Sequence, residues 1–426
     1  MGAGASEPQA GEGGAGGTGG AGENPVEARL VVADPVASTL YIYDVPSLEQ
    51  VAVVEDVTFA DHPGFLPTKD GRVLFADSGT QELVALQVLG EDVGVVGRAH
   101  LPRPAVHLAV DPMHEYAAVS GAGEDAASPG EFTLVRLSDF FHKSVVIPTG
   151  EPGIFLGGSP LYLYHRNDSP ARVEAYSFED LWDGQVSLAG SAEIGDAPHG
   201  EAIAHAAGKL FVAADDGINV MSVDGATFGD VNVIPYDVDG KTGGRAYYAR
   251  LSFDGKYLYS YLRDSGPAFD WPWRDWVSDA YIVDVENETA KRLEVGNGLV
   301  YRLADSAKYA MFVQYHPDGD YAFFLDADPS SDTFQEMVGK VALETLSLAP
   351  TGEDADPWSS VAFRIAGMVP SGRYGFVTHG GDGKISVIDT ASMEVTAQIE
   401  LPTPLDYGGY LVGIEAGAVV RDTIGR

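Results

Sequence analysis

Cysteine is absent from this chain of 426 residues, so disulfides, thiolate metal sites and cysteine catalysis are excluded. Any transition-metal site must therefore be built from histidine, aspartate and glutamate side chains. Basic residues are scarce: 26 lysines and arginines stand against 63 aspartates and glutamates, a formal net charge of −37. Because such a surface repels phosphate backbones and anionic lipid, we expect no nucleic-acid partner, and we expect metal cations or basic patches on other proteins instead.

The chain also lacks an apolar run long enough to span a bilayer, and long amphipathic helical patterns are nearly missing. Residues 1–28 are rich in glycine, alanine and glutamate and cannot bury enough surface to offset the entropy of ordering. We therefore predict a disordered, Gly-rich tether there. Such a tether is typical of the mature end of an exported protein, which predicts a periplasmic or extracellular location and leaves open a lipid anchor on a removed N-terminal segment.

From residue 29 onward, short runs of valine, tyrosine, leucine, phenylalanine and alanine alternate with Gly/Asp/Pro turns. Segments made of a turn followed by a strand recur, as in TKDGRVLFAD, SFDGKYLYSY and PSGRYGFVTH, and their turns fall at positions 71, 114, 159, 208, 255, 319 and 372. A period of roughly 40–50 residues is that of one four-stranded propeller blade. The spacing thus predicts seven complete blades.

The two ends of the chain supply a further blade. Residues 29–57 have the pattern of second, third and fourth strands without a first, and residues 405–417 have that of a first strand alone. We therefore predict an all-β fold: a single eight-bladed β-propeller over residues 29–426, closed by N- and C-terminal strands in one blade. Seven blades are the alternative if one unit is irregular.

In a propeller, the entries to the innermost strands and the loops between second and third strands meet on one face. His62 and His199 occupy equivalent strand entries, and His107 lies two residues further in. Neutral imidazoles with carboxylates suit zinc, although a single histidine is more often a hydrogen-bonded structural residue. The candidate metal ligands are His62, His107, His199, Glu201, Asp61 and His379.

A second candidate region is the long loop 266–281, which holds three of the five tryptophans. Trp271, Trp273, Trp276 and Arg274 have the composition of a partner-binding patch or a lid. The alternative is that this loop folds back and packs its own rings.

Two acidic segments resemble parts of calcium loops, so calcium is a second possible ion. These are Asp237–Gly240 and the group Asp326, Asp328 and Asp332, and neither supplies a complete calcium-loop pattern. No nucleophile elbow, phosphate-binding glycine loop or dinucleotide fingerprint is present, which favours a protein without catalytic activity.

FVTHGGDGKISVIDTASMEVTAQIELPTP (residues 376–404) resembles the YncE-type, surface-layer-type bacterial propellers. AVHLAVDP (residues 105–112) and the passage from EPGIFLGG to DAPHGEAIA (residues 151–204) are similar to the periplasmic zinc metallochaperones of the AztD type. That resemblance implies an exported propeller that hands zinc to the substrate-binding protein of a metal importer. It matches the family's histidine–glycine strand entry to His199-Gly200-Glu201.

These observations predict an exported, non-catalytic binding propeller that holds a divalent metal, zinc first, near the mouth of the central channel. One alternative is a scaffold that docks a protein or a glycan through its acidic face and tryptophan loop. The other is a metal-dependent hydrolase of the lactonase kind that uses the same pocket.

Overall fold

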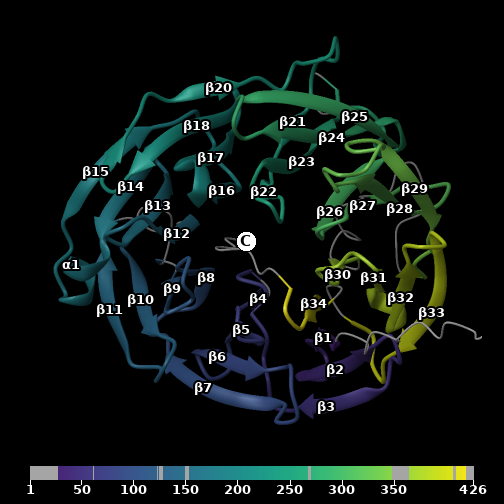
Figure 1. Ribbon diagram of the computed structural model, residues 1–426, viewed down its shortest axis with the longest axis horizontal. Helices are drawn as coiled ribbons and strands as arrows, with labels where there is room; N and C mark the ends of the chain where they lie inside the picture. Colours follow the sequence, from purple (N-terminus) through teal and green to yellow (C-terminus); the bar gives the residue numbers. More distant parts are fainter. Residues whose placement is uncertain are drawn as a thin grey trace, which may run out of the picture.

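Eight small antiparallel sheets form a ring around a central axis, in chain order, in the computed structural model (Figure 1). The structure describes residues 27–418 except 61, 122, 124–127, 149–152, 267–269, 348–363 and 406–408. The eight-bladed all-β propeller predicted from the repeats is therefore confirmed, and the seven-bladed alternative is wrong. The predicted tether lies outside the described residues except for Glu27 and Ala28, where the first strand begins.

Each blade is numbered by its place along the chain, and its strands are named from the innermost outward. Blade 1 contains β34 (Tyr410–Glu415), β1 (Ala28–Asp34), β2 (Thr39–Val45) and β3 (Gln50–Val54). Blade 2 contains β4 (Leu66–Pro67), β5 (Arg72–Asp77), β6 (Glu82–Gln87) and β7 (Gly94–His100). Blade 3 contains β8 (Ala105–Val110), β9 (Tyr116–Gly121), β10 (Gly130–Arg136) and β11 (His142–Ile147). Blade 4 contains β12 (Gly153–Gly157), β13 (Tyr162–Asp168), β14 (Ala171–Ser177) and β15 (Leu188–Glu193).

The second half of the ring repeats this plan with small additions. Blade 5 contains β16 (Glu201–Ala204), β17 (Lys209–Ala214), β18 (Gly217–Asp224), β19 (Thr227–Phe228) and β20 (Asn232–Ile234). Blade 6 contains β21 (Arg245–Ala246), β22 (Arg250–Leu251), β23 (Tyr257–Asp264), β24 (Val277–Asp284) and β25 (Thr289–Asn297). Blade 7 contains β26 (Leu299–Asp305), β27 (Tyr309–Tyr315), β28 (Tyr321–Asp326) and β29 (Met337–Ala342). Blade 8 contains β30 (Ala366–Met368), β31 (Tyr374–His379), β32 (Lys384–Asp389) and β33 (Glu394–Glu400).

Helices are few and short, and they lie in the connections between strands. The described residues contain α1 (Phe178–Trp182) and the 3₁₀ turns η1 (His205–Ala207), η2 (Trp273–Asp275) and η5 (Gly380–Asp382). No helix in the described part of the chain is long and apolar enough to cross a membrane. In blades 6 and 8, the tight turns that join first and second strands use glycine in the left-handed region, with φ of 71° at Gly255 and 79° at Gly372. A side chain would make that backbone conformation costly.

Hydrophobic side chains are buried mainly between neighbouring blades. The second and third strands carry almost continuous apolar runs because each blade is covered on both faces, and β27 is buried along its whole length. The outermost strand has one exposed face instead, so β33 alternates between exposed and more buried residues. The apolar clusters therefore bridge successive blades and hold the ring together.

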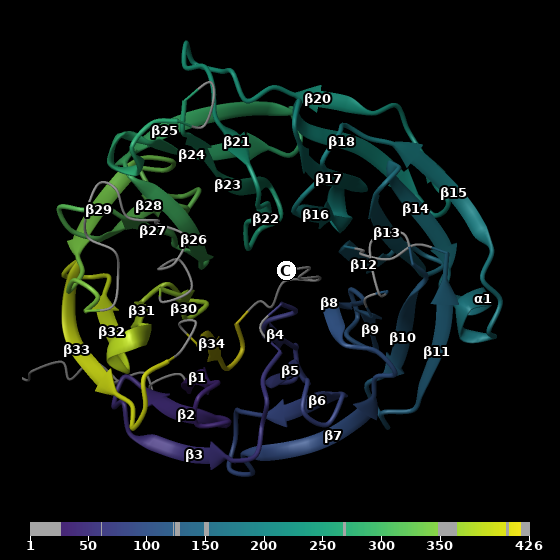
Figure 2. The ribbon, with the colours of Figure 1, turned by 180° about the vertical axis from the view of Figure 1, so that it is seen from behind.

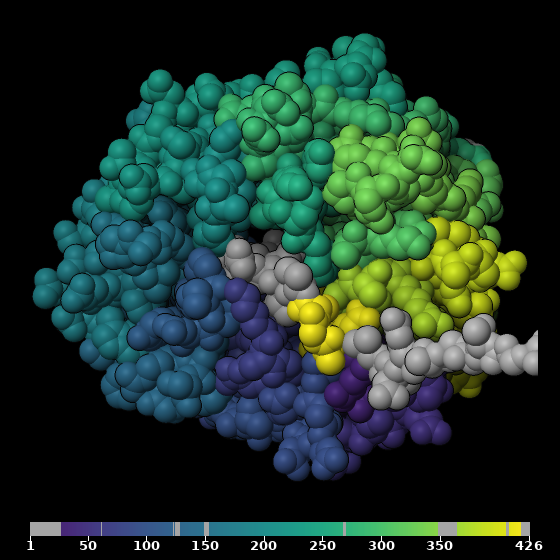
Figure 3. All heavy atoms as spheres, in the orientation of Figure 1, coloured from purple at the N-terminus to yellow at the C-terminus, as the bar shows by residue number. Residues whose placement is uncertain are grey.

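The ring closes in blade 1, where the C-terminal strand β34 pairs antiparallel with β1. Its register runs from Ala28 opposite Glu415 to Ala33 opposite Tyr410. Seen from behind, the same innermost strands surround the axis (Figure 2). In the space-filling view, the purple N-terminal strands and the yellow C-terminal strands are neighbours in the ring (Figure 3). The closure predicted from the two incomplete end units is confirmed.

Candidate functional site

A cavity of about 460 Å³ lies along the axis of the ring and is lined chiefly by the innermost strands of the blades. Each of these strands starts from the same face, so residues at strand entries lie at one mouth of the cavity. Residues just after the strands, such as Phe253 and Pro370, lie toward the other end. The size is that of an ordinary small-molecule pocket, which spans roughly 300–1,000 Å³.

Three of the predicted histidines line this cavity. The rings of His62 and His107 have centroids 5.2 Å apart and stand edge to face at 90°. His62 Nδ1 is 2.6 Å from the carbonyl oxygen of Val106. Because a carbonyl can only accept, Nδ1 carries the proton and Nε2 keeps its lone pair.

His199 reaches the cavity from blade 5 and is held in a similar way. Its Nδ1 is 3.2 Å from the carbonyl oxygen of Tyr247, and its exposed ring stands edge to face against the Tyr247 ring. This contact leaves Nε2 of His199 as the nitrogen with the lone pair. A carbonyl oxygen that accepts from one ring nitrogen is a usual partner of a metal-binding imidazole.

Glu201 lines the same cavity but already has a cationic partner. Its Oε2 is 3.1 Å from Nε of Arg166, and both side chains are buried. Arg166 also donates to the carbonyl oxygen of Pro198 at 2.6 Å and pairs with Asp168 at 3.2 Å. Glu201 therefore balances the charge of Arg166 in the wall.

The other two candidate ligands are Asp61 and His379, and the structure describes only His379. Asp61 lies outside the described residues. His379 is buried in blade 8 and is absent from the lining of the cavity; its Nε2 is 2.6 Å from the Ser386 hydroxyl and its Nδ1 is 3.4 Å from Arg364. Burial, together with the Arg364 charge, lowers the pKa of His379 to about 4. The structure thus separates His379 from the three cavity histidines.

No three histidine, aspartate or glutamate side chains are arranged to hold a metal ion within the parts of the chain that the structure describes. The acidic segments considered for calcium make other contacts. Asp326 accepts hydrogen bonds from Ser331 and Thr333 at 2.5 and 2.6 Å. Asp237 accepts from the Gly243 amide, and Asp239 accepts from that of Arg292. These carboxylates act as turn acceptors.

The tryptophan loop packs most of its own rings. Trp273 and Trp276 are 5% and 8% exposed, in an apolar cluster that also contains Leu299, Tyr315 and Leu346. The indole of Trp276 donates to the carbonyl oxygen of Trp271, the one ring of the three that is exposed. Arg274 pairs with Asp318 at 3.0 Å. This arrangement agrees with the self-packing interpretation, and partner binding through these residues stays a prediction.

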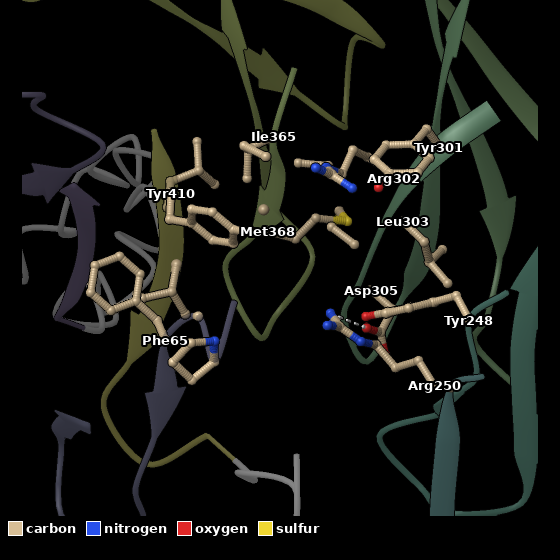
Figure 4. Close-up of a pocket in the computed structure, with 18 of the residues that line it drawn as sticks. Phe65, Tyr248, Arg250, Tyr301, Arg302, Leu303, Asp305, Ile365, Met368 and Tyr410 are labelled. Carbon is tan, nitrogen blue, oxygen red and sulfur yellow. Dashed lines mark ion pairs between the residues drawn. The ribbon is translucent and has the colours of Figure 1, made fainter. Parts of the chain in front are cut away.

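The sequence interpretation missed the arginine and tyrosine side chains deeper in the cavity (Figure 4). Arg250 pairs with Asp305 at 3.6 Å. The guanidinium of Arg263 lies 5.1 Å from the centre of the Tyr247 ring. That of Arg302 lies 4.0 Å from the centre of the Tyr301 ring. One available signal was the presence of arginine on innermost strands of a chain so poor in basic residues.

Comparisons with known proteins support the fold. No family model matches the chain, and no curated protein matches it. The chain is similar to apo AztD from Citrobacter koseri, with 14% identity, a TM-score of 0.62, and 92% of this chain and 100% of that chain covered. A second crystal structure of Citrobacter koseri AztD gives 12% identity, a TM-score of 0.63 and coverage of 93% and 100%.

A third similar structure is the dihydro-heme d1 dehydrogenase NirN in complex with DHE. It shares 15% identity and a TM-score of 0.57, with 91% of this chain and 75% of that chain covered. At these identities the likeness concerns the propeller fold alone. The resemblance to AztD is therefore supported for the architecture, and the resemblance to YncE-type propellers stays a prediction.

Proposed function

We propose that this chain is a non-catalytic binding propeller that holds a divalent metal ion, zinc first, at the histidine mouth of its central cavity. The observation that carries the proposal is the His62–His107 pair, two imidazoles from neighbouring blades in edge-to-face contact at the cavity wall. Imidazole is the commonest metal ligand, and a chain without cysteine has to rely on it.

The spacing of the pair supports zinc. Zinc binds histidine nitrogen at about 2.0–2.1 Å with tetrahedral angles, which places the centroids of two bound rings about 5 Å apart. The observed separation of the His62 and His107 centroids is 5.2 Å. The pair therefore needs little rearrangement at the level of ring positions.

His199 is the proposed third ligand. Its ring is exposed and lines the same cavity, and binding the metal would require it to leave its contact with Tyr247. A water molecule would complete the tetrahedron, and the buried Arg166–Glu201 pair would fix the wall beneath it. Asp61 follows β3 in the sequence and stands next to His62, which makes it a proposed carboxylate neighbour of the metal.

The wider role follows from the likeness to AztD and stays part of the proposal. The likeness in fold is to AztD, and the resemblance of the sequence to that type implies a metallochaperone that works outside the cytoplasm. We propose an exported protein that passes its metal to the substrate-binding protein of an importer. The net charge of −37 would attract both the cation and a basic docking surface.

The test is a calorimetric titration of zinc into chelator-treated protein. We expect about one equivalent to bind, His62→Ala/His107→Ala to abolish binding, and His199→Ala to weaken it by about tenfold or more. His316→Ala is the matched control, because His316 lies in a turn near Asp318, outside the cavity lining. Undiminished zinc affinity in the double variant would overturn the assignment, and so would the absence of zinc binding by the unmodified chain.

A further inference from the structure

We propose that the middle of the cavity is a binding site for a small organic carboxylate, anchored by Arg302. Arg302 lies on β26, the innermost strand of blade 7, and its side chain reaches across toward Ile365 and Met368 on the blade 8 side (Figure 4). It is separate from the histidine mouth. The inference goes beyond metal binding and does not depend on it.

Within the described part of the chain, the guanidinium of Arg302 forms no ion pair with a carboxylate. Among the described residues, no aspartate or glutamate lies within ion-pair distance of it, and its Nε is buried without a hydrogen-bond partner. Other cavity arginines differ, since Arg166 pairs with Asp168 and Glu201, and Arg250 pairs with Asp305. Arg302 is partly buried, and a partly buried charge without a counter-ion favours an anion that supplies one.

The composition of the wall points in the same direction. The whole chain has 63 acidic and 26 basic residues, yet the cavity lining contains as many arginines as carboxylates. The arginines are Arg166, Arg250, Arg263 and Arg302, and the carboxylates are Asp168, Glu201, Asp305 and Glu415. The cavity is therefore far less acidic than the chain as a whole, which is the condition for admitting an anion.

The surroundings of Arg302 indicate the rest of the ligand. Tyr261, Tyr301 and Tyr410 line the cavity, and their rings offer flat apolar surfaces with hydroxyls that can donate to an oxyanion. Ile365 and Met368 add aliphatic surface opposite the guanidinium. The Arg302 guanidinium supplies one positive charge in a fork that fits a carboxylate, so a monocarboxylate with a flat apolar body matches better than a phosphate dianion.

The first experiment compares 2-naphthoate with its neutral analogue 2-naphthamide, each titrated into chelator-treated protein in calorimetry at pH 7.5. We expect the carboxylate to bind at least tenfold more tightly than the amide. Equal affinities, or no binding of 2-naphthoate at millimolar concentration, would overturn the proposal. Because no metal is present, the outcome is independent of the zinc titration.

The second experiment assigns the anchor. We expect Arg302→Gln to lose the tenfold preference for the carboxylate, and Arg302→Lys to keep part of it because the charge remains. Arg98→Gln is the control, since Arg98 pairs with Glu82 on the outer part of blade 2 and lies away from the cavity. An unchanged preference in Arg302→Gln would refute the role of this arginine. Arg302→Gln should still bind zinc, which separates failure of this proposal from failure of the metal site.

The unfolding temperature of Arg302→Gln separates anion binding from a structural role, because the two roles predict changes in opposite directions. Without ligand, Arg302→Gln should unfold at the same temperature as the unmodified chain or higher, because an uncompensated charge has been removed. With saturating 2-naphthoate, only the unmodified chain should gain thermal stability. A variant that unfolds at a lower temperature without ligand would show that Arg302 supports the fold, contrary to the proposal.

Discussion

Removing the closing strand should weaken the entire ring. A chain that ends at Leu405 lacks β34, which contributes Leu411 and Ile414, 6% and 3% exposed, to the clusters on either side of blade 1. Burial of each side chain is worth about 1.5–3 kcal/mol, so the pair accounts for about 3–6 kcal/mol. The lost ladder with β1 adds to this, and whole domains are stable by only about 5–15 kcal/mol.

Thermal unfolding followed by circular dichroism measures the effect. An unfolding entropy of about 2.1 cal/mol/K per residue gives roughly 0.8 kcal/mol/K for a ring of this length, so 3–6 kcal/mol lowers Tm by about 4–7 °C. The control is a chain that ends at Ala418, which keeps β34 intact. We also expect faster proteolysis of β1 in the shorter chain. Equal Tm values and equal proteolysis rates for the two chains would refute the closure reasoning.

Three further changes test the interior. The pKa of His379 is about 4 in the folded chain and about 6.5 when unfolded. The free energy of unfolding should therefore fall by about 3 kcal/mol as the pH drops from 6.5 toward 4. Urea titrations at pH 7 and pH 4.5 should show a smaller fall for His379→Gln. Gly413→Ala should lower the free energy of unfolding by about 1–3 kcal/mol, because the added Cβ would lie 2.5 Å from a backbone oxygen of blade 8. Gly94→Ala is the control, since its Cβ would meet nothing within 4 Å and stability should be nearly unchanged. Asp279→Asn breaks a buried pair with a guanidinium 2.8 Å away and should lower the free energy of unfolding in urea by about 3–5 kcal/mol. Asp139→Asn in an exposed pair should have a much smaller effect, and equal losses would contradict the role of burial.

The fold could be predicted because the same local chemistry recurs in every blade. Turns such as those at Gly255 and Gly372 place glycine in a left-handed conformation, and they mark hairpins between first and second strands in the sequence. The turn at 319 lies instead between β27 and β28, the second and third strands of blade 7. Closure could be predicted as well, because strand-like segments at the two ends complete each other. The prediction of eight blades depended on both the recurring turns and the complementary segments at the two ends.

Side-chain direction limited the prediction of the site. His62, His107 and His199 converge because strand entries of every blade meet at the axis, which topology alone dictates. His379 ends a second strand, where either side chain direction leads into the packing between blades, and it became a buried partner of Ser386. Arg302 lies within an apolar run of the sequence. Its place in the cavity depends on the packing of the neighbouring blades, which the sequence pattern does not show.

The innermost strands all start from the same face, which gives the channel a direction as well as a diameter. Imidazoles lie at one mouth, the Arg302 guanidinium lies in the middle, and the Arg250–Asp305 pair lies toward the far end. Under the two proposals, a ligand that enters past the histidines would reach Arg302 before a metal ion binds at the mouth behind it. Under the two proposals, ligands that enter by the histidine mouth would load in a fixed order, the organic anion first and the cation second.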